Sequence, residues 1–167
     1  MSVETMDDLF LDTLKDIYYA EKQILKALPQ MTKKAVTPKL KKSLENHRVE
    51  TEGQIERLEQ VFEIIGEKAR GKKCPAMDGI IAEAKEHMSE IEDEVVRDAG
   101  IIAASQAVEH YEICRYGTLV SWAELLGHTK AVRLLQQNLK EEKNADALLS
   151  NLAESQVNQQ AKMRDAA

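Results

Sequence analysis

Acidic side chains stand in the apolar stripes of four successive segments with helical periodicity, where together they could bind metal ions. In the first segment Glu21 is in register with apolar residues spaced three and four positions apart, among them Phe10, Leu14, Ile17, Ile24 and Leu28. This spacing is typical of the face that a helix buries against its neighbours. Because carboxylates are almost never fully buried without a partner, a glutamate on such a face predicts a compensating cation.

The later segments carry further candidate ligands in pairs three or four positions apart, which places both members of a pair on one helix face. The pairs are Glu50 with Gln54, Glu109 with Glu112, and Glu142 with Asp146. With the first segment included, the predicted ligand set is Glu21, Glu50, Gln54, Glu109, Glu112, Glu142 and Asp146.

Several carboxylates that converge from four helices repel one another, and a bound metal pair is the simplest compensation. Oxygen ligands from opposing helices are also the composition of dinuclear sites in helix bundles. We therefore predict two iron or manganese ions per chain. The alternative is that the stripes are misplaced by one position and the glutamates are solvated, but this error would have to recur on all four segments.

Other polar residues near these positions leave alternatives open. His47 lies on the second stripe, one turn before Glu50, and is either a ligand or a hydrogen-bonded core histidine. His110 directly follows Glu109 and points about 100° away from it, which favours a supporting or subunit-facing role. Tyr116 could donate a hydrogen bond to a carboxylate or simply pack in the core. The two cysteines do not form a disulfide framework, and Cys114 is interpreted as a structural thiol.

The composition favours helix throughout, because the chain is rich in Ala, Leu, Glu, Lys and Gln and has only 7 Gly and 3 Pro. A cap at Thr5 and Asp8 opens a helix that runs toward Val36, and Pro29 should kink it or end its regular part. The other expected helices cover about 38–65, 75–89, 92–126 and from 128 or 129 past 151, with a frayed tail at 159–167.

Short connections join the first helix to the second and the two last helices to each other, whereas a long connection with its own short helix lies between these hairpins. This order predicts an all-α fold, a ferritin-like (rubrerythrin-like) four-helix bundle with an additional short helix in the crossover. At 167 residues, positions 1–167 are expected to form a single domain.

Charge and hydropathy exclude some partners. The net charge of −6 argues against nucleic acid, since no basic stripe is available for phosphates. No apolar run approaches the roughly 20 residues that span a bilayer. The start Met1-Ser2-Val3-Glu4 has no charged and apolar regions of a signal peptide. We expect a cytoplasmic protein that binds neither membrane nor nucleic acid.

Several motifs resemble the bacterial YciE/YciF-type stress-response proteins, and the resemblance covers nearly the whole chain. They are Asp16-Ile17-Tyr18-Tyr19-Ala20-Glu21-Lys22-Gln23, Gly53-Gln54-Ile55-Glu56-Arg57, Cys74-Pro75-Ala76-Met77, Val108-Glu109-His110-Tyr111-Glu112, Tyr116-Gly117-Thr118-Leu119, and Glu141-Glu142-Lys143 with Asp146. The resemblance implies a ferritin-like bundle akin to rubrerythrins, a homodimer and a role in stress responses. It does not define a reaction.

The chain departs from the Glu-x-x-His pattern of the wider di-iron superfamily. Gly53 follows Glu50 at the histidine position and Ala145 follows Glu142, so that Gln54 and Asp146 are the nearby substitutes. An oxygen-rich set favours hard ions such as Fe(III) or Mn(II). The leading hypothesis is redox chemistry with peroxide or dioxygen, which would make the chain a di-metal oxidoreductase. The alternative is a non-catalytic helical scaffold or binding protein with a structural or vestigial metal site.

Overall fold

The computed structural model describes residues 3–164, and every regular element in that range is helical. Four long helices form a bundle: α1 (Met6–Lys34), α2 (Pro38–Ile64), α4 (Glu94–Leu125) and α5 (Thr129–Leu152). The shorter α3 (Pro75–Glu90) lies in the connection between α2 and α4. A π-helical turn, η1 (Ala153–Val157), leads from α5 into α6 (Asn158–Arg164).

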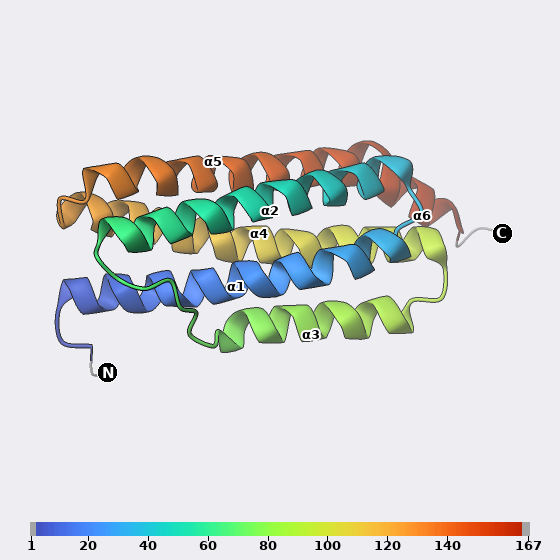
Figure 1. The fold of residues 1–167 in the computed structure, drawn as a ribbon. Coiled ribbons are helices and arrows are strands. Elements are labelled where there is room, and N and C mark those ends of the chain that lie inside the picture. The colour runs from blue at the N-terminus through green and yellow to red at the C-terminus, as the bar shows by residue number, and fades with distance from the viewer. Residues whose placement is uncertain (1–2, 165–167) are drawn as a thin grey trace.

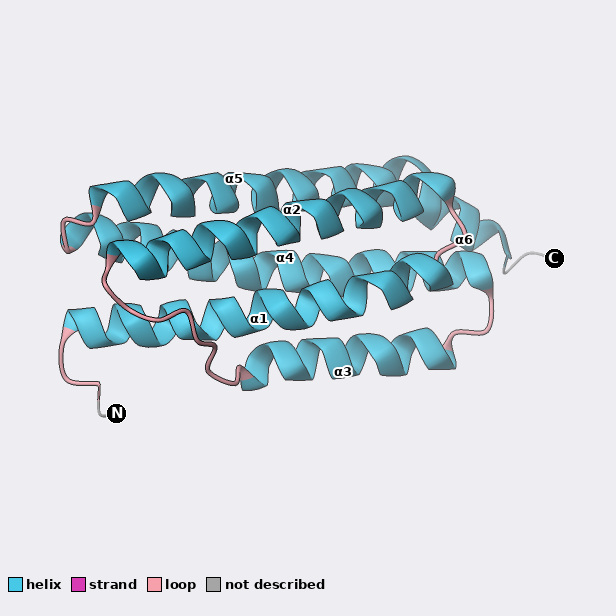
Figure 2. Cartoon of the chain, in the orientation of Figure 1, coloured by secondary structure: helices cyan, strands magenta, loops and turns pink. Residues whose placement is uncertain are grey.

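The bundle consists of two helical hairpins joined by one long crossover. In the bundle α1 contacts α2 and α4, and α5 contacts the same two helices. Each long helix runs antiparallel to both of these neighbours (Figure 1). The third helix lies outside the bundle against α1 and α4 (Figure 2). The expected all-α bundle with an additional short helix in the crossover is therefore confirmed.

Local sequence signals explain where the helices begin and end. Thr5 and Asp8 form a reciprocal capping box at the start of α1, and the Asp93 carboxylate accepts two backbone N–H groups at the start of α4. Gly66 and Gly127 end α2 and α4 with φ of 74° and 76°, a conformation that costs other residues more than glycine.

The first helix runs through Pro29 to Lys34, close to the expected end near Val36, with Pro29 exposed on its surface. One segment differs from the expectation. The tail expected to fray is helical to Arg164, because α6 packs back on α4. Residues 165–167 of that tail, like Met1 and Ser2 of the start, lie outside the described residues.

A buried carboxylate fixes the tight turn between α1 and α2. Asp98 of α4 is fully buried, and its two oxygens accept the backbone N–H groups of Val36 at 3.0 Å and Thr37 at 2.7 Å. This contact ties the end of the first hairpin to the second one. Among the described residues, no helix is both long and apolar enough to cross a membrane.

Candidate metal centre

A layer of buried polar side chains interrupts the apolar core, and every long helix contributes to it. Glu21 comes from α1, Gln54 from α2, Glu109 and Glu112 from α4, and Glu142 from α5. All five side chains have a relative exposure of 1% or less. The apolar residues around them, such as Ile17, Leu58 and Leu119, are also completely buried, so that this layer is shielded from solvent.

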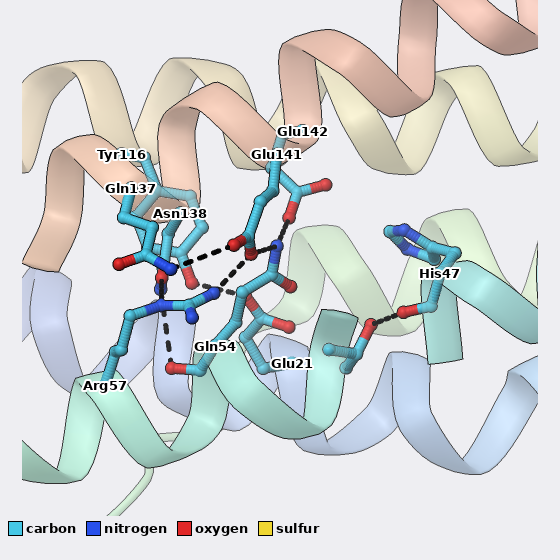
Figure 3. A network of polar contacts seen from close by, with 10 residues as sticks. Glu21, His47, Gln54, Arg57, Tyr116, Gln137, Asn138, Glu141 and Glu142 are labelled. Carbon is cyan, nitrogen blue, oxygen red and sulfur yellow. Dashed lines mark hydrogen bonds and ion pairs between the residues drawn. The ribbon is translucent and has the colours of Figure 1, made fainter. Parts of the chain in front are cut away.

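Hydrogen bonds hold one side of the layer in place between α2 and α5 (Figure 3). The Gln54 amide nitrogen donates to Glu142, through a short contact, and to Glu141 at 3.2 Å. Arg57 binds Glu141 and Asn138, and the Asn138 amide donates to the Gln54 carbonyl oxygen at 3.4 Å. The guanidinium of Arg57 thus forms its ion pair with Glu141 at the edge of the layer. It forms no ion pair with the buried carboxylates of the layer.

Tyr116 fixes the carboxylate on the opposite side of the layer. Its hydroxyl donates a short hydrogen bond to Glu21 Oε1, and its ring is fully buried. Tyr116 therefore fulfils both possibilities that the sequence left open, because it packs in the core and also donates to a carboxylate.

The layer contains buried polar atoms for which the described residues provide no hydrogen-bond partner. They are Oε2 of Glu21, Glu109 and Glu142, both carboxylate oxygens of Glu112, Oε1 of Gln54 and both ring nitrogens of His47. One ligand atom each from His47, Glu109, Glu112 and Glu142 lies within 4.8 Å of every other. A buried polar group without a partner is costly, so these atoms are suited to a bound group that would compensate for their burial.

Burial raises the pKa values of the carboxyl groups, because the charged form is desolvated. It raises the pKa of Glu109 to about 12, with the neighbouring Glu142 adding to the shift. It raises the pKa of Glu142 to about 7, although hydrogen bonds from Glu109 and Gln54 lower it. The pKa values of Glu21 and Glu112 also lie well above 4.5, through burial and the charge of Glu142. Without cations, these groups resist ionisation.

His47 belongs to the cluster, although the spacing alone left its role open. Its Nε2 lies 3.6 Å from Glu109 Oε1, and burial lowers the pKa of its ring to about 4. The ring is therefore neutral at pH 7 and offers a nitrogen lone pair, which is the form that binds metals. The hydroxyl of Thr51 donates to the His47 carbonyl oxygen at 2.8 Å and stabilises this turn of α2.

Two of the predicted ligands lie at the edge of the buried cluster. Glu50 is only partly buried, on the surface side of the α2 turn that carries His47. Asp146 accepts a hydrogen bond from Gln106 at 3.0 Å and lies 3.3 Å from the ring of the exposed His110. The structure thus brings together Glu21, Gln54, Glu109, Glu112 and Glu142, and it adds His47.

The residues of the cluster fit a pair of hard divalent or trivalent cations. Four carboxylates and one amide supply oxygen donors, and the neutral imidazole supplies nitrogen. Their partnerless atoms point into one dry layer, so that ions bound there would satisfy several of them at once. Sequence reasoning did not include Glu141 in the site; its partners Arg57 and Gln54 on the facing helix draw it to the cluster.

Comparisons with known proteins find a family and a similar protein. Residues 5–162 match the family described as "Domain of unknown function (DUF892)". Protein YciF of Escherichia coli (strain K12) is 46% identical over 162 residues, which cover 96% of this chain and 98% of that protein. The sequence relationship therefore extends over nearly the whole of both chains.

Solved structures of similar proteins have the same fold. The E. coli stress protein YciF has a TM-score of 0.89 at 46% identity, with 93% of this chain and 99% of that chain covered. YcfI from Rhodopseudomonas palustris, for which a structural role has been suggested, has a TM-score of 0.88 at 55% identity, with 89% and 95% covered. A protein from Xanthomonas campestris shares the fold at 22% identity and a TM-score of 0.77, over 98% of this chain and all (100%) of that one.

Proposed function

Because this chain belongs to the DUF892 family, in which a close relative is a stress protein, we propose that it is a ferritin-like stress-response protein that binds two iron or manganese ions in its bundle core. The observation that carries the proposal is the set of partnerless, buried carboxylate oxygens contributed by α1, α4 and α5. Four buried carboxylates without compensating cations would strongly destabilise a bundle of this size.

Bound iron or manganese would supply electron transfer to peroxide or dioxygen, which is the chemistry that the proposal assigns to the site. The protein residues hold and orient the donor atoms. Glu21, Glu109, Glu112 and Glu142 would provide charge, and His47 a neutral nitrogen. Tyr116 and Gln54 each fix one carboxylate by donating a hydrogen bond to it. The fully buried apolar residues around the layer exclude water from it.

The test begins with metal analysis of protein purified without chelators, followed by a peroxide-consumption assay after loading with Fe(II) or Mn(II). We expect two ions per chain and peroxide turnover. The double variant Glu109→Ala and Glu142→Ala should lose both, while a matched pair of exposed glutamates, Glu56→Ala and Glu83→Ala, should leave both unchanged. Protein that neither retains nor takes up two ions would refute the proposal.

The second candidate is a scaffold whose ions only brace the bundle, and the structural role suggested for the R. palustris relative favours it. In a scaffold, ion removal lowers the free energy of unfolding, but the loaded protein does not consume peroxide or dioxygen. The same metal-loaded preparation therefore separates the two functions. A scaffold should also bind redox-inactive Zn(II) with the same stabilising effect as Mn(II).

The remaining expectations also belong to this proposal. We propose a homodimer in the cytoplasm, with a small oxidant as the reacting partner and without nucleic acid. Light scattering after size-exclusion chromatography would test the oligomeric state. A monomer at micromolar concentration would remove the dimer from the proposal without affecting the metal site, because the described cluster is built from one chain.

A further inference from the structure

Two pockets reach the metal cluster from opposite sides of the bundle. One opens between α2 and α5, and the other between α1, α3 and α4. Both are lined at their inner ends by His47, Ser105 and Glu109. His47 and Glu109 are buried and have partnerless polar atoms, so that each pocket ends at side chains that can receive a ligand.

The pocket between α2 and α5 is polar at its mouth and has an internal volume of ≈ 60 Å³. Ser43, Asn46 and Glu50 line it on α2, and Leu148 lies exposed at its edge on α5. The carboxylate of Glu50 forms neither a hydrogen bond nor an ion pair within residues 3–164. It therefore remains available to an incoming cation, which loses hydration water more easily when oxygen ligands replace it.

The pocket between α1, α3 and α4 is almost entirely apolar and has an internal volume of ≈ 30 Å³. Its walls are aliphatic or sulfur-containing side chains, with Lys85 and Gln30 at the rim; the apolar walls include Ile24, Leu28, Met31, Ile81, Met88 and Val108. Such a volume holds one or two water-sized molecules. An apolar cavity disfavours water and ions but accepts a small apolar molecule such as dioxygen.

We propose that the two pockets divide access to the centre: Glu50 receives divalent cations in the polar pocket and passes them to His47 and Glu109, whereas dioxygen reaches the same two residues through the apolar pocket. This inference rests on the proposed function, because it assumes that the cluster binds ions. It gives Glu50 a role in ion entry in place of the ligand role predicted from spacing. It also gives dioxygen a route to the centre that is separate from the route of the ions.

Cation entry is tested by the rate of Co(II) uptake, followed by the visible absorption that appears when Co(II) binds to protein ligands. Glu50→Ala and Glu50→Gln should slow uptake about tenfold, because a negative charge at a pocket mouth raises the local cation concentration. The number of ions bound at saturation should equal that of the wild type. Glu56→Ala, on the same helix but exposed and outside the pocket, should not change the rate.

Four outcomes of this experiment have distinct meanings. Unchanged uptake by both Glu50 variants would overturn the entry role. Loss of a bound ion at saturation would also overturn it and would make Glu50 a ligand. If the wild type takes up no ion at all, the proposed function itself fails, and the entry role fails with it. Slow uptake with full final occupancy supports the inference.

Dioxygen access is tested by filling the apolar pocket from two different helices with Ala104→Phe on α4 and Ala27→Leu on α1. Both residues line the apolar pocket, and neither lines the polar pocket between α2 and α5. Xenon, an apolar probe, should bind there in crystals of the wild type and not in crystals of the variants. In solution, air oxidation of the Fe(II)-loaded variants should slow about tenfold, with Co(II) uptake unchanged.

Absence of xenon from the wild-type pocket, or air oxidation at the wild-type rate in a variant that no longer binds xenon, would overturn the apolar route. The same conclusion follows if Glu50→Ala slows the oxidation of fully loaded protein as much as Ala104→Phe does, because the two routes would then not be separate. The xenon measurement requires no bound metal, so that it tests the pocket even if the proposed function fails.

Discussion

The side-chain amide of Gln54 on α2 donates its hydrogen bond to the Glu142 carboxylate on α5, and its own Oε1 is left without a partner inside the bundle. The amide nitrogen therefore orients the predicted ligand Glu142, while the amide oxygen remains available to bind a cation. This relationship explains how an amide can take a place in an otherwise acidic layer.

Replacement of Gln54 by leucine should destabilise the metal-free protein at pH 8. Loss of the donor leaves another buried oxygen of Glu142 without a partner, which costs about 1–3 kcal/mol. The pKa of Glu142 should also rise further, because the hydrogen bond from Gln54 lowers it. Urea unfolding measures the change, and Gln60→Leu, exposed on the same helix, serves as the control. Equal stability of Gln54→Leu and the wild type would contradict the assignment.

Neutralisation of Glu112 should have opposite effects with and without metal. Both of its oxygens lack partners, and burial together with Glu142 raises its pKa. At pH 8, Glu112→Gln should therefore stabilise the metal-free protein by about 1–3 kcal/mol. With saturating Mn(II), the same variant should gain less stability than the wild type, because a charged ligand is lost.

Thermal unfolding with and without Mn(II) measures both effects. Glu124→Gln, an exposed substitution on the same helix, should change neither. If Glu112→Gln destabilises the metal-free protein and leaves the Mn(II) effect intact, then Glu112 is a structural group and not a ligand.

The sequence predicted the bundle well because its helix signals are local. The capping box at Thr5, the proline that opens α2 and the glycines that end α2 and α4 all act within a few residues. The effect of Pro29 on α1 could not be predicted in this way, because it depends on tertiary packing: Leu28 and Met31 are buried on both sides of the proline.

The candidate site was predictable where the apolar stripe is regular and less so elsewhere. Glu21, Glu109, Glu112 and Glu142 are buried as their register predicted, and Gln54 with them. On α2 the stripe is polar over a whole turn, so that spacing could not decide between His47 and Glu50. Asp146 lies on the edge of α5 where it and Ser150, one turn later on the same helix, accept hydrogen bonds from Gln106 of α4. This contact between helices is a tertiary property that periodicity does not encode.

The metal-free protein should lose stability as the pH rises from 6.5 to 9. A carboxyl group whose folded pKa is raised contributes stability that is fully present below its unfolded pKa of 4.5 and is lost as the pH rises through the folded value. Burial raises the pKa of Glu109 to about 12 and that of Glu142 to about 7. For each carboxyl group that stays protonated in the folded protein in this window, the free energy of unfolding falls by about 1.4 kcal/mol per pH unit.

His47 acts in the opposite direction but in another window, since burial lowers its pKa from 6.5 to about 4. The contribution of His47 to the free energy of unfolding therefore grows as the pH rises from about 4 to 6.5, and it is constant above pH 6.5. Urea midpoints of chelator-treated protein at several pH values measure the slope. Added Mn(II) should reverse it, because carboxylates bind metal in the deprotonated form. A flat profile without metal would show that the four glutamates ionise freely.

Asp98 provides a test that separates the two kinds of buried carboxylate in this chain. Like Glu112 it is fully buried, but its oxygens accept the N–H groups of Val36 and Thr37. Asp98→Ala should therefore lower the free energy of unfolding by at least about 1.5–3 kcal/mol. Asp98→Asn should recover only part of this loss, because an amide offers one acceptor oxygen to two donors.

Mn(II) should raise the stability of both Asp98 variants by the same increment as that of the wild type, since the turn between α1 and α2 needs no cation. The increment is measured as the shift in thermal midpoint at a fixed Mn(II) concentration, in parallel with Glu112→Gln. A reduced increment in the Asp98 variants would mean that the turn and the cluster are coupled. If Mn(II) raises the thermal midpoint of the Asp98 variants as much as that of the wild type, but raises that of Glu112→Gln less, the ions bind in the layer formed by the glutamates. In that layer, buried carboxylate oxygens lack protein donors.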